Sequence, residues 1–193
     1  MSIQKRRERE RAERERLIVT AARELAETEG WDAVTTRRLA AEIEYSQPVL
    51  YSHFKGKDAI MAAVAVEGCV ELAAELRTAR TKATTPKDAL AAVGQAYTAF
   101  AHRRPALYDA MFTHHVDLPF ATPEAPAPLK EAFGEILQAV EPIAAENENP
   151  DLLTETYWAA LHGLVTLMRS GRLPKEAQET RLALLITHFA TTP

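Results

Sequence analysis

The chain has 193 residues, with 23 Lys and Arg against 27 Asp and Glu, a net charge of −4, and a single cysteine, Cys69. This length is sufficient for a small domain and a larger one with its own core. A single cysteine excludes an intramolecular disulfide framework and fits a reducing compartment. We interpret Cys69 as a small packing residue, with a redox-sensing thiol as the less favoured alternative.

No export or membrane signal follows from the sequence. The basic N-terminal stretch is not followed by the apolar segment of a secretory signal. The longest uncharged run, residues 89–102, has 14 residues, whereas a membrane-spanning helix needs about 20. We therefore expect a cytoplasmic protein with no membrane partner.

The acidity is confined to the C-terminal part. Residues 1–60 contain 12 Lys and Arg against 11 Asp and Glu, which leaves 11 against 16 in the rest. Residues 5–16 alone contain seven basic and four acidic side chains. This run can contact phosphate groups, or it can only extend a solvated helix in which Glu10 pairs with Arg14 and Glu8 with Arg11.

The first predicted helix packs through apolar residues at helical spacing and ends at Gly30, which can adopt a left-handed cap. Its apolar positions are Leu17, Ile18, Ala21, Ala22 and Leu25.

Two short helices around a tight turn follow within residues 35–57. Thr35 or Thr36 is a good N-cap, and the first of the two helices packs through Leu39, Ala40 and Ile43. Ser46 can cap a second helix that starts at Gln47-Pro48 and buries Leu50 and Phe54 on one side. Its other faces carry hydrogen-bonding or methyl groups, as the second helix of a helix-turn-helix requires. A solvated helical hairpin is the alternative.

The remaining elements are also predicted to be helical. Proline-rich residues 117–128 predict a loop, and Gly171 with Pro174 separates the last two helices. After the two short helices, a fourth helix is predicted from Asp58 to about Thr78 and a fifth from Thr85-Pro86 to about His102. Two further helices are predicted over residues 106–112 and 129–145. Another starts at Asn149-Pro150, and the last one packs through Leu182, Leu185, Ile186 and Phe189. No strand pattern is present, and we expect an all-α fold of about nine helices.

Residues 35–57 resemble the DNA-binding domain of the tetracycline-repressor (TetR) family of bacterial regulators. The signature is Tyr51-Ser52-His53-Phe54-Lys55-Gly56-Lys57, which follows the family's Tyr-x-His-Phe-x-x-Lys pattern. Residues 158–163 are similar to the Trp-x-x-x-His-Gly segment of one C-terminal subgroup. The resemblance implies a three-helix DNA-binding domain with a helix-turn-helix, residues 1–58, and a larger helical domain for ligand binding and dimerisation, residues 59–193.

The resemblance also implies which residues contact double-stranded DNA. Arg37 and Gln47 correspond to base-reading positions, and Tyr51, His53 and Lys57 to backbone contacts. His53 has an alternative role as a packed residue beside Phe54. The full set of expected contacts is Thr35, Thr36, Arg37, Ser46, Gln47, Pro48, Val49, Tyr51, Ser52, His53 and Lys57.

The sequence departs from the family pattern in the turn and in the second helix. The family places Gly then Val in the turn, whereas this chain has Glu44-Tyr45. Either Glu44 occupies the left-handed position or the turn shifts by one residue. The founding member has Thr at the position of Val49 and Trp at that of Ser52, so its operator sequence does not transfer.

A pocket for an unknown small molecule is implied for the C-terminal helices, together with a homodimer interface formed by the last two. Apolar side chains with a few polar tips suit such a pocket, although the same residues can simply pack in a core. The candidate ligand contacts are Tyr97, Phe100, Met111, Phe112, His115, Trp158 and His162.

Catalysis is the weakest interpretation. His114, His115 and Asp117 invite a metal, but adjacent helix positions point about 100° apart and no further ligand stands at a suitable spacing. We expect no catalytic residue, metal or cofactor. The sequence predicts a homodimeric repressor that a ligand releases from a palindromic operator, with a ligand-independent or protein-partnered regulator as the alternative and a helical enzyme as a distant third.

Overall fold

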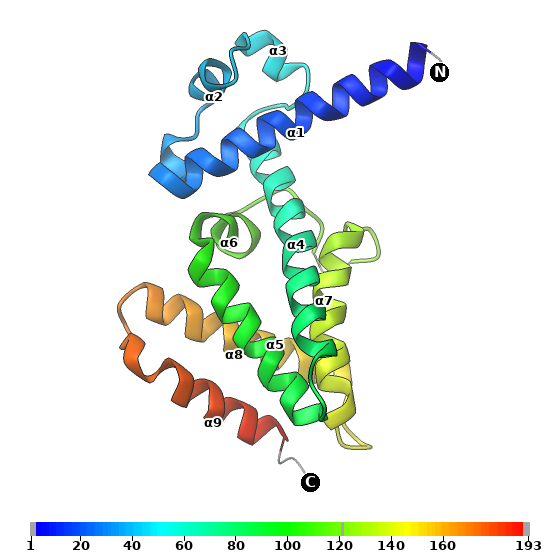
Figure 1. The fold of residues 1–193 in the computed structure, drawn as a ribbon, viewed down its shortest axis with the longest axis vertical. Helices are drawn as coiled ribbons and strands as arrows, with labels where there is room; N and C mark the ends of the chain where they lie inside the picture. The colour runs from blue at the N-terminus through cyan, green and yellow to red at the C-terminus, as the bar shows by residue number, and fades with distance from the viewer. Residues whose placement is uncertain (1–2, 121, 191–193) are drawn as a thin grey trace. The chain divides into compact units, whose positions relative to one another are not determined.

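The computed structural model describes residues 3–120 and 122–190, in which all regular structure is helical (Figure 1). The nine α-helices of these ranges confirm the predicted all-α fold. They are α1 Ile3–Glu29, α2 Thr36–Glu42, α3 Gln47–Tyr51, α4 Lys57–Thr81, α5 Pro86–Arg103, α6 Pro105–Phe112, α7 Ala127–Val140, α8 Pro150–Arg169 and α9 Gln178–Ala190, with 3₁₀ helices at Trp31–Ala33, Glu141–Ile143 and Lys175–Ala177. None of the described helices has the length and apolar character needed to cross a membrane.

The described chain forms two compact units. The first contains the residues up to Gly68 and Arg104–Pro126, and the second contains Cys69–Arg103 and the residues from Ala127 onward. Helix α4 therefore contributes residues to both units, and α6 folds with the N-terminal helices. A boundary between the two functions at residue 58 stays a prediction.

Helix α1 supplies one wall of the first unit. Its buried residues are Ile18, Val19, Ala21, Ala22, Leu25 and Ala26. Leu17, which we placed on this face, is instead 44% exposed. It lies about 100° around the helix from Ile18, beyond the edge of the buried stripe.

Two side chains of the N-terminal segment fix α6 within the first unit. The carboxylate of Glu27 accepts hydrogen bonds from the backbone N–H groups of Ala106 and Leu107, at 3.1 and 3.0 Å. The Trp31 indole N–H donates to the Ala106 carbonyl oxygen at 2.8 Å. Glu27 thus serves as the cap of α6, because the residue at the N-cap position, Arg104, makes no side-chain capping bond.

The turn between α2 and α3 contains a residue in the left-handed region. Glu44 has φ 55°, and it is the only residue other than glycine with a positive φ in the described ranges. The N–H of Tyr45 donates to the Ala40 carbonyl at 2.8 Å and that of Glu44 to the Ala41 carbonyl at 3.3 Å, which is a Schellman cap of α2. Of the two alternatives left open by the sequence, the structure has Glu44 in the left-handed position and no shift of the turn.

Replacing Glu44 by Gly should stabilise the protein by about 0.5–1 kcal/mol. The left-handed conformation costs an L-residue about 1–2 kcal/mol, and glycine avoids this cost. Glycine also loses more backbone entropy on folding, which cancels about 0.5–1 kcal/mol of the gain in stability. Urea unfolding measures the difference. Ala41→Gly, at an exposed position within α2, is the control and should lower stability by about 1 kcal/mol. A Glu44→Gly variant no more stable than the wild type would contradict strain at this turn.

Helix α7 ends earlier than predicted. It stops at Val140 and continues only as a 3₁₀ helix to Ile143, so the prediction of a helix to Ala145 is wrong at this end. Pro142 has no N–H to donate, and its ring clashes with the carbonyl oxygen four residues earlier in an α-helix.

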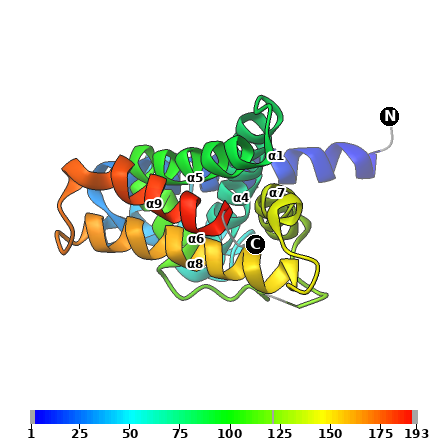
Figure 2. The same ribbon diagram turned by 90° about the horizontal axis from the view of Figure 1, so that it is seen from below.

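Helices α5, α7, α8 and α9 form most of the second unit, with α5 packed against the other three (Figures 1 and 2). The crossing of α5 and α8 depends on Gly94, where a Cβ atom would collide with the Tyr157 hydroxyl group. That hydroxyl donates to the Leu90 carbonyl oxygen at 2.9 Å, and burial raises the pKa of Tyr157.

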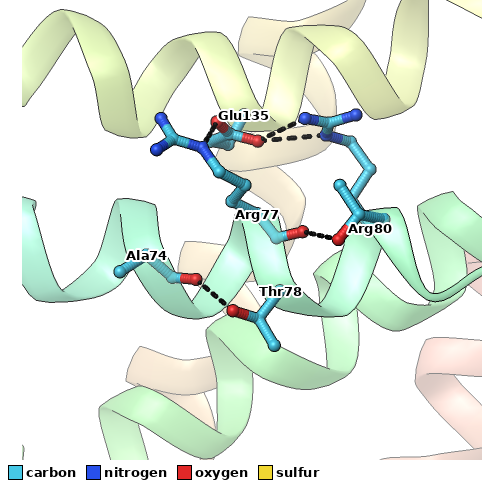
Figure 3. A network of polar contacts seen from close by, with 6 residues as sticks. Ala74, Arg77, Thr78, Arg80 and Glu135 are labelled. Atoms are coloured by element: carbon cyan, nitrogen blue, oxygen red, sulfur yellow. Dashed lines mark hydrogen bonds and ion pairs between the residues drawn. The ribbon is translucent and has the colours of Figure 1, made fainter.

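A buried carboxylate joins α7 to the end of α4 (Figure 3). The side chain of Glu135 is 3% exposed. Its Oε1 accepts from Arg77 Nε at 2.6 Å, and its Oε2 accepts from Arg80 Nη2 at 2.7 Å and Nε at 3.0 Å. Arg80 is itself 20% exposed, whereas Arg77 is 56% exposed. Three charge-assisted hydrogen bonds from two arginines thus compensate the removal of this carboxylate from water.

Glu135→Ala should lower the free energy of unfolding by about 2–4 kcal/mol. The variant leaves a cavity and deprives Arg80 of its partner in a poorly solvated position. Thermal or urea unfolding checks the magnitude. Glu131→Ala, at an exposed position of the same helix, should change stability by less than about 0.5 kcal/mol. Equal effects of the two substitutions would show that the network contributes little.

Candidate nucleic-acid interface

Helix α2 and helix α3 have the local features predicted for a helix-turn-helix. Thr35 is the N-cap of α2, where its side chain accepts from the Arg38 N–H at 3.2 Å, and Leu39 and Ala40 are buried. Helix α3 buries only Leu50. Ser46 stands at the N-cap position of α3, but its side chain makes no capping bond there, so the expected capping role is not observed.

The residues around the buried Leu50 are exposed. Val49 is 37% and Tyr51 51% exposed, and Ser46, Gln47, Pro48 and Ser52 are exposed as well. Ser52 Oγ donates to the Val49 carbonyl at 2.6 Å. A helix of five residues with a single buried side chain therefore presents nearly all its surface outward.

The two neighbouring arginines of α2 differ in their surroundings. Arg38 forms a two-pronged ion pair with the Glu29 carboxylate, with Nη1 at 2.7 Å from Oε2. Arg37 is exposed and has no ion-pair partner among the described residues. Of the two, Arg37 therefore has a guanidinium free to contact an external group.

Thr36 and Tyr51 connect the start of α2 to the end of α3. Their hydroxyl oxygens are 3.3 Å apart, at hydrogen-bonding distance. This bond orients the Tyr51 ring along the exposed side of the motif.

His53 and Lys57 have partners within the first unit. The His53 side chain is 6% exposed, and its Nδ1 is 3.3 Å from a carboxylate oxygen of Glu15. The ammonium group of Lys57 donates to the Trp31 carbonyl oxygen. The alternative of a packed His53 thus describes this structure, and phosphate contact by either residue stays a prediction.

The candidate ligand contacts fall into two groups. Tyr97 and Phe100 are fully buried in the second unit, and the Trp158 indole N–H donates to the Tyr97 hydroxyl at 2.9 Å. His162 Nε2 lies 3.4 Å from the Thr166 hydroxyl, one turn along α8.

The other three candidates belong to the first unit. Met111 is buried, His115 is exposed, and the ring of Phe112 packs edge-on against Tyr108 with centroids 5.1 Å apart. The structure therefore brings together Tyr97 and Trp158, with His162 on the same helix.

Sequence reasoning missed a groove of about 690 Å³ between α5 and α9. On α5 the groove is lined by Ala91, Gln95 and Thr98. These small or polar side chains recur at helical spacing, and this pattern is the sequence signal that could have indicated the groove. The remaining lining residues are Lys87, Asp88, Ala99, Gln178, Glu179, Leu182, Ala183, Ile186 and Thr187.

Metal and thiol chemistry find no support in this structure. The described residues contain no group of three or more His, Cys, Asp and Glu side chains that could hold a metal ion. Cys69 is 3% exposed, and burial raises the pKa of its thiol to about 12. A thiol that stays protonated and inaccessible is a packing group.

A capped first helix, a Schellman turn and an exposed second helix define a helix-turn-helix of the DNA-binding kind. Comparison with known families agrees. Residues 18–64 match the family described as bacterial regulatory proteins of the tetR family, and residues 90–189 match the tetracyclin repressor-like C-terminal domain. The chain belongs to the TetR family and is a DNA-binding transcriptional regulator.

Proteins with similar sequences are described as transcriptional regulators or repressors. An uncharacterised helix-turn-helix transcriptional regulator of Mycobacterium tuberculosis is 28% identical over 155 residues, which is 80% of this chain and 69% of that protein. The class D tetracycline repressor of Escherichia coli is 46% identical over 50 residues, or 26% of this chain and 23% of the repressor.

Solved structures share the fold. A protein of unknown function from Rhodococcus sp. RHA1 has a TM-score of 0.75 and 22% identity, and the match covers 91% of this chain and 93% of that protein. The putative regulatory protein SCO4313 has a TM-score of 0.72 and 20% identity, and the match covers 96% and 98% of the two chains.

Proposed function

We propose that this protein is a repressor that binds a palindromic operator as a homodimer and releases it when a small molecule binds. The observation that carries the DNA-binding part is the exposed face of α3 together with the exposed, unpaired Arg37 of α2. Arg37 and Gln47 read bases, with guanine and adenine as their respective partners, and Pro48 and Val49 contact thymine methyl groups. Tyr51 and Lys57 contact the phosphate backbone, for which Lys57 exchanges its bond to the Trp31 carbonyl.

In-vitro selection of binding sites from random duplexes tests base reading. Arg37→Ala and Gln47→Ala should each cost about 1–3 kcal/mol on the selected operator and relax the preference at one position per half-site. Arg38→Ala is the matched control, because its guanidinium is tied to Glu29. That variant should keep the selected sequence. Unchanged selection by the Arg37 and Gln47 variants would refute the assignment.

The homodimer rests on apolar surface that the second unit leaves uncovered. Leu152 and Leu167 of α8 are 60% and 40% exposed, and Leu184 of α9 is 56% exposed. A Cβ atom added at Gly163 would meet no atom within 4 Å. Exposed apolar and small residues on two helices suit packing against a second copy.

Leu184→Glu should raise the dimer dissociation constant by at least about 10-fold, because two-fold symmetry buries the new charge twice. Sedimentation equilibrium gives the constant. Gln138→Glu, on the exposed side of α7, introduces the same charge and should leave the dimer intact. A wild-type dissociation constant for Leu184→Glu would place the interface elsewhere.

The ligand proposal rests on the pair formed by Tyr97 and Trp158, with His162 half-buried one turn away on α8. Two aromatic groups with polar tips can orient a small molecule. A TetR variant from Acinetobacter baumannii has been solved in complex with minocycline, and it has a TM-score of 0.64 to this chain at 21% identity. The fold shared with that complex supports the proposal that this chain binds a small molecule.

His162→Trp should lower the affinity of an inducing compound at least about 10-fold by placing a bulkier side chain one turn from Trp158, while ligand-free operator binding is retained. A thermal-shift screen on the wild type supplies the compound, and titration of operator affinity measures the response. Gln138→Trp controls for added bulk. A normal response from the His162 variant would remove this residue from the pocket. Failure of every compound to shift wild-type stability or operator affinity would favour a ligand-independent regulator.

A further inference from the structure

Helix α1 begins well before the part of the DNA-binding domain that the family shares. The family match starts at residue 18, whereas α1 starts at Ile3 (Figure 1). The first buried residue of the helix is Ile18, and each residue from Ile3 to Leu17 is exposed or partly exposed. We call residues 3–17 the arm. Packing within the first unit does not explain why the arm is present.

The ion pairs of the arm differ from the predicted ones. Glu10 was expected to pair with Arg14 and Glu8 with Arg11, but the pairs that form are Arg6–Glu10, Arg9–Glu13 and Arg11–Glu15, at 3.1, 4.0 and 2.8 Å. The predicted pairs were wrong. In the structure each of these glutamates pairs with the arginine four residues before it, whereas in the predicted pairs the arginine came after the glutamate in the sequence. As a result, Arg7 and Arg14 have no ion-pair partner in the described part of the chain, and both are exposed.

These two arginines lie on one face of the arm. A separation of seven residues corresponds to about 700°, so Arg7 and Arg14 are within about 20° of each other. Ile18 is eleven residues after Arg7, again within about 20°, and it begins the buried stripe of α1. Arg7 and Arg14 therefore occupy, in the arm, the same face of α1 that is buried against the rest of the first unit from Ile18 onward.

The helix-turn-helix lies on this same side of α1. Tyr45 of the turn shares a surface groove of about 660 Å³ with Arg14 and Leu17. His53, after α3, contacts Glu15. The groove residue Leu17 and the contact residue Glu15 lie on either side of the Arg7–Arg14 stripe around the helix, so this stripe begins next to the motif and continues toward the N-terminus of α1. Residues 5–16 also carry a net charge of +3 from seven basic and four acidic side chains.

We propose that the arm binds the phosphate backbone of duplex DNA next to the operator half-site, through Arg7 and Arg14. This inference rests on the proposed binding of DNA by α3. Seven residues of α-helix separate the Cα atoms of Arg7 and Arg14 by about 10 Å along the helix axis. This is about three base-pair steps of 3.4 Å along the DNA axis, so the two side chains can reach different phosphates. The contacts carry no sequence information and add affinity on every duplex.

The test compares two double variants that remove the same charge. Arg7→Gln/Arg14→Gln removes the unpaired arginines, and Arg6→Gln/Arg9→Gln removes paired ones that lie off the Arg7–Arg14 stripe. Glutamine retains helix propensity, and circular dichroism confirms the helix content. Fluorescence anisotropy of the full chain on a random-sequence duplex and on the selected operator, between about 50 and 200 mM salt, gives the dependence of affinity on salt.

The first double variant should lower the salt slope by about 0.9 for each phosphate that is no longer neutralised, or by about two per protomer. Its affinity should fall by a similar factor on both duplexes, whereas the second variant should be affected much less. Arg7→Lys/Arg14→Lys should restore the slope. Wild-type behaviour of the first variant, or equal effects in both, would overturn the role of the arm. A wild type that binds neither duplex would instead refute the proposed function.

Discussion

The first unit depends on the capping of α6 by Glu27. Helix α6 begins at Pro105 without a side-chain cap of its own, and the two N–H groups that Glu27 satisfies would otherwise be buried donors without acceptors. Trp31 adds a hydrogen bond to the first turn of the same helix. Since capping and charge–dipole terms each contribute on the order of 1 kcal/mol, these contacts hold a segment that comes 79 residues later in the chain against the DNA-binding helices.

The helix-turn-helix uses little of its sequence for stability. Helix α3 has five residues and one buried side chain, and the preceding turn places Glu44 in a conformation that glycine adopts more readily. Thr36 and Tyr51, which join the two helices through their hydroxyl groups, are also on the exposed side. Because so few side chains are used internally, most side chains of α3 are exposed on the surface of the first unit.

The second unit contains polar contacts that fix how its helices meet. Glu135 satisfies arginines from two successive turns of α4, and Gly94 allows Tyr157 to approach the α5 backbone. Such contacts require particular partners, whereas apolar packing tolerates many. The donor–acceptor pair of Trp158 and Tyr97 belongs to the same set, and a ligand that displaced it would have to replace that hydrogen bond.

Local chemistry in the sequence determined where several helices begin. Thr35, Thr85-Pro86 and Asn149-Pro150 start α2, α5 and α8 as their capping properties predict. The two helices of the DNA-binding motif also followed from spacing, whereas the choice of Arg37 followed from family resemblance. The capping and spacing signals act within about one turn of helix, so they can be read along the chain.

Only the tertiary structure decided which charged residues have partners. Glu135 resembles any surface glutamate in the sequence, and its arginines lie 58 and 55 residues away. Tertiary packing likewise decides that Arg38 bonds Glu29 and that His53 is buried beside Glu15. It also decides that α6 belongs to the first unit. Desolvation and ion pairing depend on the three-dimensional neighbours of a group, and a pattern of residue types along the chain does not contain them.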